Sequence, residues 1–414
     1  MKRRVVVTGM GVVAPVGNNV ADFWNNIKNG KSGIDFITRF DTADFKVKIA
    51  AEVKNLNIED YMPKKETKRM DIFCQYAIAA ADQAMADSGL NTEAVDPHRF
   101  GVIVGSGIGG LSTIEEQVIR MHNMGPARIG PLFVPMAIVN MASGNIAIRF
   151  GAKGFSGCSV TACASANNSI GDAYRKIQDG IADIMLAGGA EASICGIGIG
   201  GFANLKALTE STDPSRASIP FDLERKGFVM GEGAGILVLE ELEMAQKRGA
   251  KVYAEIVGYG TNCDAHHMTS PDPEGEGATG AIELALSDQQ IPKHKISYIN
   301  AHGTSTKLND AAETMAIKRV FGEGAYKIPV SSTKSMIGHL LGAAGAAEAI
   351  ITIMALRENF LPPTIGYQQP DEECDLDYVP NKGRSHPMAY ALSNSFGFGG
   401  HNAVLCFKKW EGNA

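Results

Sequence analysis

Short apolar runs alternate with helix-period patterns along most of the chain. The runs expected to form strands are residues 4–8, 100–104, 183–191, 251–257, 296–301 and 328–332. Apolar positions at helical spacing predict helices between them, among others at residues 111–121, 240–248 and 340–354. The last of these is apolar nearly all round, so we expect it to be buried. The alternation predicts an α/β architecture with largely buried sheets.

One cysteine stands where a predicted strand turns into a helix. Residues 157–161 have the character of a strand end, and apolar residues recur at helical spacing over 170–177. Amide groups at a helix N-terminus favour negative charge, so the Cys163 thiol is expected to ionise readily and to act as a nucleophile. A buried structural cysteine is the other interpretation, and residues elsewhere in the chain must decide between them.

The second half of the chain repeats the strand–turn–buried-helix arrangement. The first unit carries Cys163, and the second carries Lys334 and His339 ahead of the long apolar helix. The repeat predicts two related halves that meet at a shared site. We expect them to be residues 1–250 and residues 251–414.

Three ionisable side chains lie at strand ends in glycine-rich surroundings, namely His302, Lys334 and His339. Taken singly, His302 could cap a turn, Lys334 could be a solvated loop lysine and His339 could be an N-cap residue. Together with Cys163, at the positions where α/β folds carry catalytic groups, they indicate a nucleophilic active site.

Composition and charge exclude several classes of protein. The 414 residues are 45% hydrophobic and 20% charged, as in a globular protein with an ample core, and the net charge of −6 argues against a general nucleic-acid binder. Residues 1–4 lead directly into a strand-like run, so we expect no signal peptide, and no apolar run reaches the roughly 18 residues of a membrane span. The seven scattered cysteines predict reduced cytoplasmic thiols rather than a disulfide framework or a metal site.

Four motifs, in a fixed order, carry the chemistry-bearing residues. They are Val-Thr-Ala-Cys-Ala-Ser at 160–165, Asn-Ala-His-Gly-Thr-Ser-Thr at 300–306, Ser-Thr-Lys-Ser with Gly-His at 332–339, and Asn-Ser-Phe-Gly-Phe-Gly-Gly at 394–400. The chain resembles the β-ketoacyl-[acyl carrier protein] synthases over nearly its whole length, and within them the synthase II group of bacterial fatty acid elongation. The resemblance implies the thiolase fold, with five layers α-β-α-β-α built from two related halves, and a homodimer.

The resemblance also implies a decarboxylative Claisen condensation. The Cys163 thiolate would take the acyl group from an acyl carrier protein in a ping-pong scheme. His302 and His339 would stabilise the enolate that forms when malonyl carrier protein loses its carboxylate. The backbone N–H groups of Cys163 and Phe398 would hold the tetrahedral oxyanion, giving a 3-oxoacyl carrier protein two carbons longer.

Further roles follow from the resemblance alone. Lys334 would be paired with Glu348 in a supporting role, and a structural monovalent cation could bind near Asn300, Glu348 and Ser393. No other cofactor is implied beyond the phosphopantetheine that carries the substrates. The residues expected at the substrate are Thr304, Thr306, Thr269, Ser270, Ile108 and Phe202, with Phe133 of the partner subunit at the far end of the acyl pocket.

The resemblance also implies a basic patch that would dock the acidic carrier protein. This patch is formed by Lys64, Lys65, Lys68, Arg69, Arg128 and Lys206. The alternatives are plain core packing for the apolar residues and a solvated helix face for the basic ones.

Other functions are separated by the same residues. A thiolase would carry a second cysteine in the C-terminal glycine loop, where this chain has Phe398, and the initiating synthase would have an asparagine where this chain has His339. A chain-length factor would lack Cys163. The glycine-rich loop, residues 105–110, matches the G-x-G-x-x-G spacing of dinucleotide sites, but no acidic residue follows at the expected distance. We therefore expect this loop to pack closely around an acyl chain rather than to bind a nucleotide.

Overall fold

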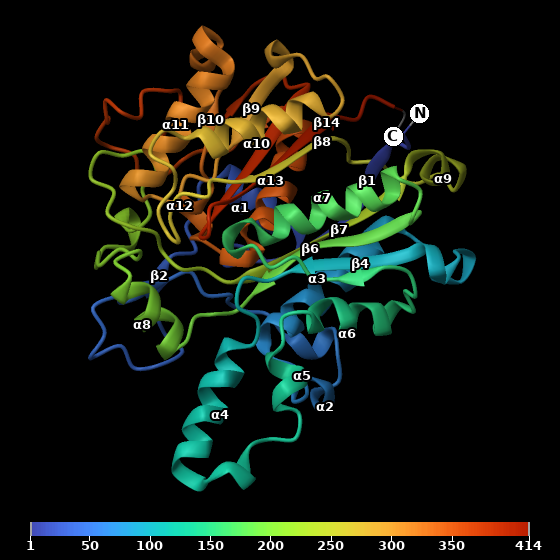
Figure 1. Ribbon diagram of the computed structural model, residues 1–414, viewed down its shortest axis with the longest axis vertical. Coiled ribbons are helices and arrows are strands. Elements are labelled where there is room, and N and C mark those ends of the chain that lie inside the picture. The colour runs from blue at the N-terminus through green and yellow to red at the C-terminus, as the bar shows by residue number, and fades with distance from the viewer. Residues whose placement is uncertain (1, 413–414) are drawn as a thin grey trace.

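Two sets of five strands with the same topology join into one sheet (Figure 1). The computed structural model describes residues 2–412. The strands of this sheet are β1 (Val5–Val13), β4 (Phe100–Gly105), β5 (Ser156–Gly157), β6 (Ile184–Glu191), β7 (Gly233–Glu241), β8 (Ala254–Cys263), β9 (Ile296–Asn300), β10 (Val330–Ser331), β13 (Tyr390–Gly397) and β14 (His401–Lys409). Two short pairs lie outside it, β2 (Asp35–Phe36) with β3 (Ile49–Ala50) and β11 (Phe360–Leu361) with β12 (Arg384–Ser385).

The strand order is β5-β4-β6-β7-β1 in the first half and β10-β9-β13-β14-β8 in the second. In each half the first three strands are parallel and the last two pairings are antiparallel. The halves are joined through β1 and β8, which pair over three residues. Two related halves are therefore confirmed, whereas a domain boundary between residues 250 and 251 stays a prediction.

The helices complete the layers. They are α1 (Val20–Lys28), α2 (Lys64–Thr67), α3 (Ile72–Ser88), α4 (Leu111–Met124), α5 (Phe133–Ala137), α6 (Met141–Phe150), α7 (Ser165–Gln178), α8 (Gly196–Asn204), α9 (Leu242–Lys247), α10 (Glu276–Ser287), α11 (Lys307–Phe321), α12 (Lys334–Ile337) and α13 (Ala344–Glu358). α3 covers the outer face of the first half, α10 covers that of the second, and α7 and α13 lie together between the halves. α13 is buried from Ala344 to Leu356, as its apolar character predicts. No helix within residues 2–412 is long and apolar enough to cross a membrane.

The structure corrects some predicted boundaries. Only Ser156–Gly157 is strand before the nucleophile, because the chain then leaves the sheet edge to enter a tight turn. The helix expected from residue 240 begins at Leu242, since Glu241 is still in β7 and its carboxylate accepts the N–H groups of Glu243 and Met244. The strand expected at 251–257 begins at Ala254 and extends further along the chain than predicted, to Cys263.

Candidate active site

A strained turn presents Cys163 at the entry to α7. The turn is the short 3-10 helix η5 (Ala162–Ala164), and Ala162 adopts a φ of 50°, which residues with a Cβ rarely do. The Ser165 hydroxyl fixes the turn, because it accepts the Thr161 N–H at 2.9 Å and donates to the Ala162 carbonyl at 2.6 Å. Cys163 is only 7% exposed, yet it lines the cavity described below.

The glycine-containing hairpin between β13 and β14 lies directly against this turn. A Cβ on Gly397 would lie 2.7 Å from the Thr161 carbonyl oxygen and 3.0 Å from the Cys163 nitrogen, so only glycine allows this approach. As a result, the backbone N–H groups of Phe398 and of Cys163 itself both face the Cys163 sulfur. Two N–H donors thus converge on the place where an oxyanion would form during acyl transfer.

Burial governs the ionisation of this thiol. Burial raises the pKa of Cys163 to about 12, although the Lys334 ammonium and the two N–H groups lower it. The expectation that the thiol ionises readily at a helix N-terminus is therefore wrong for the unliganded chain, because desolvation of the thiolate outweighs the favourable charges. Attack by this sulfur requires that its proton leaves during the reaction.

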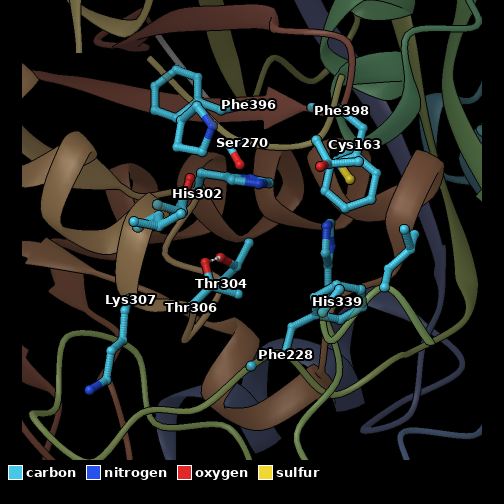
Figure 2. A pocket seen from close by; sticks show the side chains of 18 of the residues that line it. Cys163, Phe228, Ser270, His302, Thr304, Thr306, Lys307, His339, Phe396 and Phe398 are labelled. Atoms are coloured by element: carbon cyan, nitrogen blue, oxygen red, sulfur yellow. Dashed lines mark hydrogen bonds between the residues drawn. The ribbon is translucent and has the colours of Figure 1, made fainter. Parts of the chain in front are cut away.

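The two histidines are held through their backbones. Glu313 of α11 accepts the N–H groups of His302 and Gly303, both at 2.8 Å. The His339 N–H donates to the Val229 carbonyl at 2.7 Å. The two rings stand nearly perpendicular with centroids 5.3 Å apart, and Figure 2 shows them turned toward the same space beside Cys163.

Both imidazoles are neutral donors or acceptors rather than cations. Burial, together with the charge of Lys334, lowers the pKa of His302 and of His339 well below 6.5. Nδ1 of His302 and both ring nitrogens of His339 are buried without a hydrogen-bond partner in the described chain. Unpaired buried nitrogens are unfavourable in a resting protein, so these rings are arranged to bond a group that enters the cavity.

Lys334 and Glu348 form a buried ion pair whose lysine charge reaches both histidines. Their side chains are each 1% exposed, and the Lys334 ammonium donates to the Glu348 carboxylate. Burial raises the pKa of Glu348 to about 7, against the opposing effect of Lys334. Lys334 is thus engaged by Glu348 and acts on the site through its charge.

A cavity of about 470 Å³ brings most of the predicted site together (Figure 2). The predicted residues that line it are Cys163, His302, His339, Phe398, Thr304, Thr306, Thr269, Ser270, Phe202 and Lys206. The hydroxyls of Thr304 and Thr306 are 2.8 Å apart. Ile108 does not line this cavity but packs in the apolar cluster that contains Phe202.

Comparison with known proteins decides the family. The profile described as "Beta-ketoacyl synthase, N-terminal domain" matches residues 2–245, and that described as "Beta-ketoacyl synthase, C-terminal domain" matches residues 253–368. The chain belongs to the β-ketoacyl synthase family. It is 52% identical over 411 residues, 99% of each chain, to 3-oxoacyl-[acyl-carrier-protein] synthase 2 of Synechocystis, and 52% identical over 409 residues, again 99% of each, to the Staphylococcus aureus protein of that name.

Solved structures agree with this assignment. A type II polyketide ketosynthase, in complex with its acyl carrier protein, matches with a TM-score of 0.92 and 39% identity over 99% of this chain and all of that chain. A β-ketoacyl synthase from Burkholderia phymatum matches with a TM-score of 0.92 and 36% identity over the same shares. The thiolase-type fold and the reaction class, acyl transfer by decarboxylative condensation, are therefore confirmed.

The basic residues of the predicted docking patch are not gathered in the single chain. Only Lys206 lines the cavity, whereas α2, which carries Lys64 and Lys65, lies well apart from α8 in Figure 1. Lys68 and Arg69 follow α2 and are exposed, and Arg128 lies in the short helix beyond α4. Phe133 is half-buried on α5 and is likewise absent from the residues that line the cavity.

Three buried oxygens fit the suggested monovalent cation. Asn300 Oδ1, Glu348 Oε2 and Ser393 Oγ have no hydrogen-bond partner in the described chain. Asn300 and Ser393 are paired across β9 and β13, and the Asn300 amide donates to the Glu348 carbonyl at 3.2 Å. An oxygen-only set of this kind suits a hard cation. No cluster of three or more histidine, cysteine or acidic residues suited to a metal ion occurs in residues 2–412.

Sequence reasoning missed two buried acids next to the site. Glu313 holds the His302 segment, and Glu191 at the end of β6 holds the glycine-rich loop. Burial raises the pKa of both carboxyls, and the N–H groups that they accept oppose this rise. Glu191 follows a Gly-Gly-Ala stretch in a buried strand, where an acid is unusual, and this was the available signal.

Proposed function

We propose that the protein elongates fatty acids, with Cys163 carrying the acyl group and malonyl-[acyl carrier protein] supplying two carbons. The observation that carries the proposal is the meeting of Cys163, His302 and His339 in one cavity, beside the backbone N–H of Phe398. Similarity over 99% of each chain to proteins named 3-oxoacyl-[acyl-carrier-protein] synthase 2 supports the same substrates.

In the first half-reaction the Cys163 sulfur attacks the acyl thioester carbon. The negative charge that develops on the carbonyl oxygen is stabilised by the N–H groups of Cys163 and Phe398. Collapse breaks the bond to the phosphopantetheine sulfur, which leaves as a thiol carrying the proton lost by Cys163. Thr304 and Thr306 at the cavity wall offer hydroxyls to the amides of the pantetheine arm.

In the second half-reaction the two imidazoles act on the malonyl thioester. Each neutral ring donates one N–H to the thioester oxygen, while the bond to the carboxylate breaks and carbon dioxide leaves with the electron pair kept on carbon. The resulting enolate attacks the acyl carbon on Cys163, the bond to the Cys163 sulfur breaks, and the 3-oxoacyl product departs on its carrier. A cation at Asn300, Glu348 and Ser393 would serve structure rather than this chemistry.

We also propose a homodimer through the first half of the chain. Large apolar side chains are exposed on one region, α4 to β5 and the turn after it, at Val118, Ile119, Met121, Met124, Leu132, Val134, Ile138, Ile148, Phe155 and Val160. β5, at the edge of the sheet, offers unpaired backbone groups to a second copy. Such a dimer would bring Phe133 of the partner subunit to the acyl pocket and would complete the basic docking patch for the carrier protein.

Because the seven cysteines are free, we place the enzyme in the reducing cytoplasm.

Mass spectrometry of the intact protein tests the function. The chain is mixed with an acyl carrier protein that carries a medium-length acyl group, and one acyl group per chain is expected. Cys163→Ala is expected to abolish the mass increase, whereas the matched control Cys195→Ala, another buried cysteine, should keep it. Acylation of the Cys163→Ala chain would contradict the assignment of the nucleophile.

A further inference from the structure

The glycine-rich loop encloses a carboxylate of the chain itself. Glu191 is fully buried, and its Oε2 accepts the Gly107 N–H at 2.6 Å, while its Oε1 accepts those of Ile108 at 3.1 Å and Gly109 at 3.2 Å. The Ser106 hydroxyl donates to Oε1 at 3.0 Å. Consecutive N–H groups form an anion-binding concavity, and here the anion is built in. This accounts for the G-x-G-x-x-G spacing without a nucleotide.

The same carboxylate reaches the second half of the chain. Its Oε2 also accepts the Gly342 N–H at 3.0 Å. Gly342 belongs to the 3-10 turn η9 (Leu341–Ala343), whose first residue, Leu341, has a φ of 49°. A Cβ on Gly342 would lie 2.2 Å from the Gly107 nitrogen, so the loop and the turn are in direct backbone contact around Glu191. All five groups around the carboxylate donate, so the geometry fits its ionised form.

Both segments carry a side chain of one apolar cluster. Ile108 from the loop and Leu341 from the turn pack in the cluster that includes Phe202 and Phe228, and these two rings also line the cavity beside Cys163. An acyl chain on the sulfur that extends beyond this cavity into the cluster must part these side chains. The N–H groups that flank them on the backbone are the ones that Glu191 holds.

We propose that Glu191 is the positioning residue that limits acyl-chain length, because it holds Ile108 and Leu341 together in the wall that a long chain must open. The inference rests on the proposed function, since it takes the acyl group to be bound at Cys163. Glu191 touches no substrate and acts through the two backbones. A short acyl group fits in the cavity and leaves the wall closed, whereas a long one has to break hydrogen bonds to the carboxylate.

Glu191→Gln tests this with little change in shape. Glutamine has one acceptor oxygen, and its NH₂ group would face N–H donors, so the wall is weakened. We expect the ratio of kcat/KM for palmitoyl to hexanoyl carrier protein to rise about tenfold, a factor worth one hydrogen bond to a charged group. Glu240→Gln is the matched control, since Glu240 is equally buried but bonds Thr8 and Arg248 elsewhere on β7; its ratio should stay that of the wild type.

Equal loss at both chain lengths in Glu191→Gln would overturn the inference, because it would indicate a purely structural role. A wild-type chain that takes up neither acyl group would instead contradict the proposed function. If the variant does not fold, the inference can be tested on the wild-type protein by measuring hydrogen exchange of its backbone N–H groups. Palmitoylation of Cys163 should speed exchange in residues 105–110 and 340–343 together, and hexanoylation should change neither. Faster exchange in only one of the two segments would also overturn it.

Discussion

Lys334→Met should separate the structural from the electrostatic role of the buried ion pair. The change removes the ammonium and leaves the Glu348 carboxylate with both oxygens unpaired in a fully buried position. Removing one partner of a buried pair costs about 3–5 kcal/mol. With an unfolding entropy of roughly 2.1 cal/mol/K per residue, 414 residues give roughly 0.9 kcal/mol/K, so the melting temperature should fall by about 3–6 °C.

The cost should depend on pH in a definite direction. Burial already raises the pKa of Glu348 to about 7, and loss of Lys334 raises that pKa further. Because this raised pKa lies above about 7, the isolated carboxyl becomes protonated as the pH falls toward neutrality. The destabilisation should therefore be largest at high pH and shrink as the pH falls toward 7. Calorimetry across pH 6–9 measures this. A matched double variant, Lys334→Met with Glu348→Leu, should recover most of the lost stability because no charge is left buried.

The same variant reports on the histidines. Lys334 lowers the pKa of His302 and of His339, so its removal should raise both. The rate of malonyl decarboxylation should fall at low pH, where the rings become cations. In Lys334→Met this fall should therefore occur at a higher pH than in the wild type. An unchanged melting temperature, together with an unchanged pH for this fall, would refute the assignment of this pair as a buried source of charge.

Three further sets of substitutions test separate parts of the enzyme. Gly397→Ala should slow acylation of Cys163 by about 10²–10³, since the added Cβ displaces the N–H of the neighbouring Phe398; a wild-type rate by mass spectrometry would contradict this. His302→Ala and His339→Ala should each reduce malonyl decarboxylation by about 10² or more, and release of carbon dioxide at the wild-type rate would exclude them as enolate donors. Lys65→Glu with Arg69→Glu should raise KM for the carrier protein but not for a coenzyme A thioester, and an equal rise for both would place docking elsewhere.

Local chemistry and patterning were sufficient to predict much of the site from the sequence. The turn that carries Cys163, the strand before His302 and the buried apolar helix are each visible as periodicity changes next to small residues. The resemblance then named many of the residues that line the cavity, but it also named Ile108 and Phe133, which do not line it. Glu191 could be noticed only as an acid in a buried strand. The roles of Glu191 and Glu313 could not be predicted, because each acts on backbone N–H groups that no spacing rule connects to it. The prediction that the Cys163 thiol ionises readily was wrong, because the burial of this thiol depends on loops from both halves of the chain.

The repeat in the fold accounts for a difference between its two matching turns. η5 and η9 follow equivalent strands and precede equivalent helices, and Ala162 and Leu341 open them with φ angles of 50° and 49°. Cys163 and Gly342 therefore occupy matching positions. The Cys163 N–H faces its own sulfur beside the open cavity, whereas the Gly342 N–H is bonded to Glu191.

Glu191 ends β6, the strand that matches β13, which ends at Gly397. At these paired positions a glycine lets the backbone approach and donate to an incoming oxyanion, while a glutamate fills the corresponding space with its own carboxyl oxygens. The fold thus supplies two equivalent turns, and the residue at the end of the neighbouring strand decides which of them is left open for a substrate.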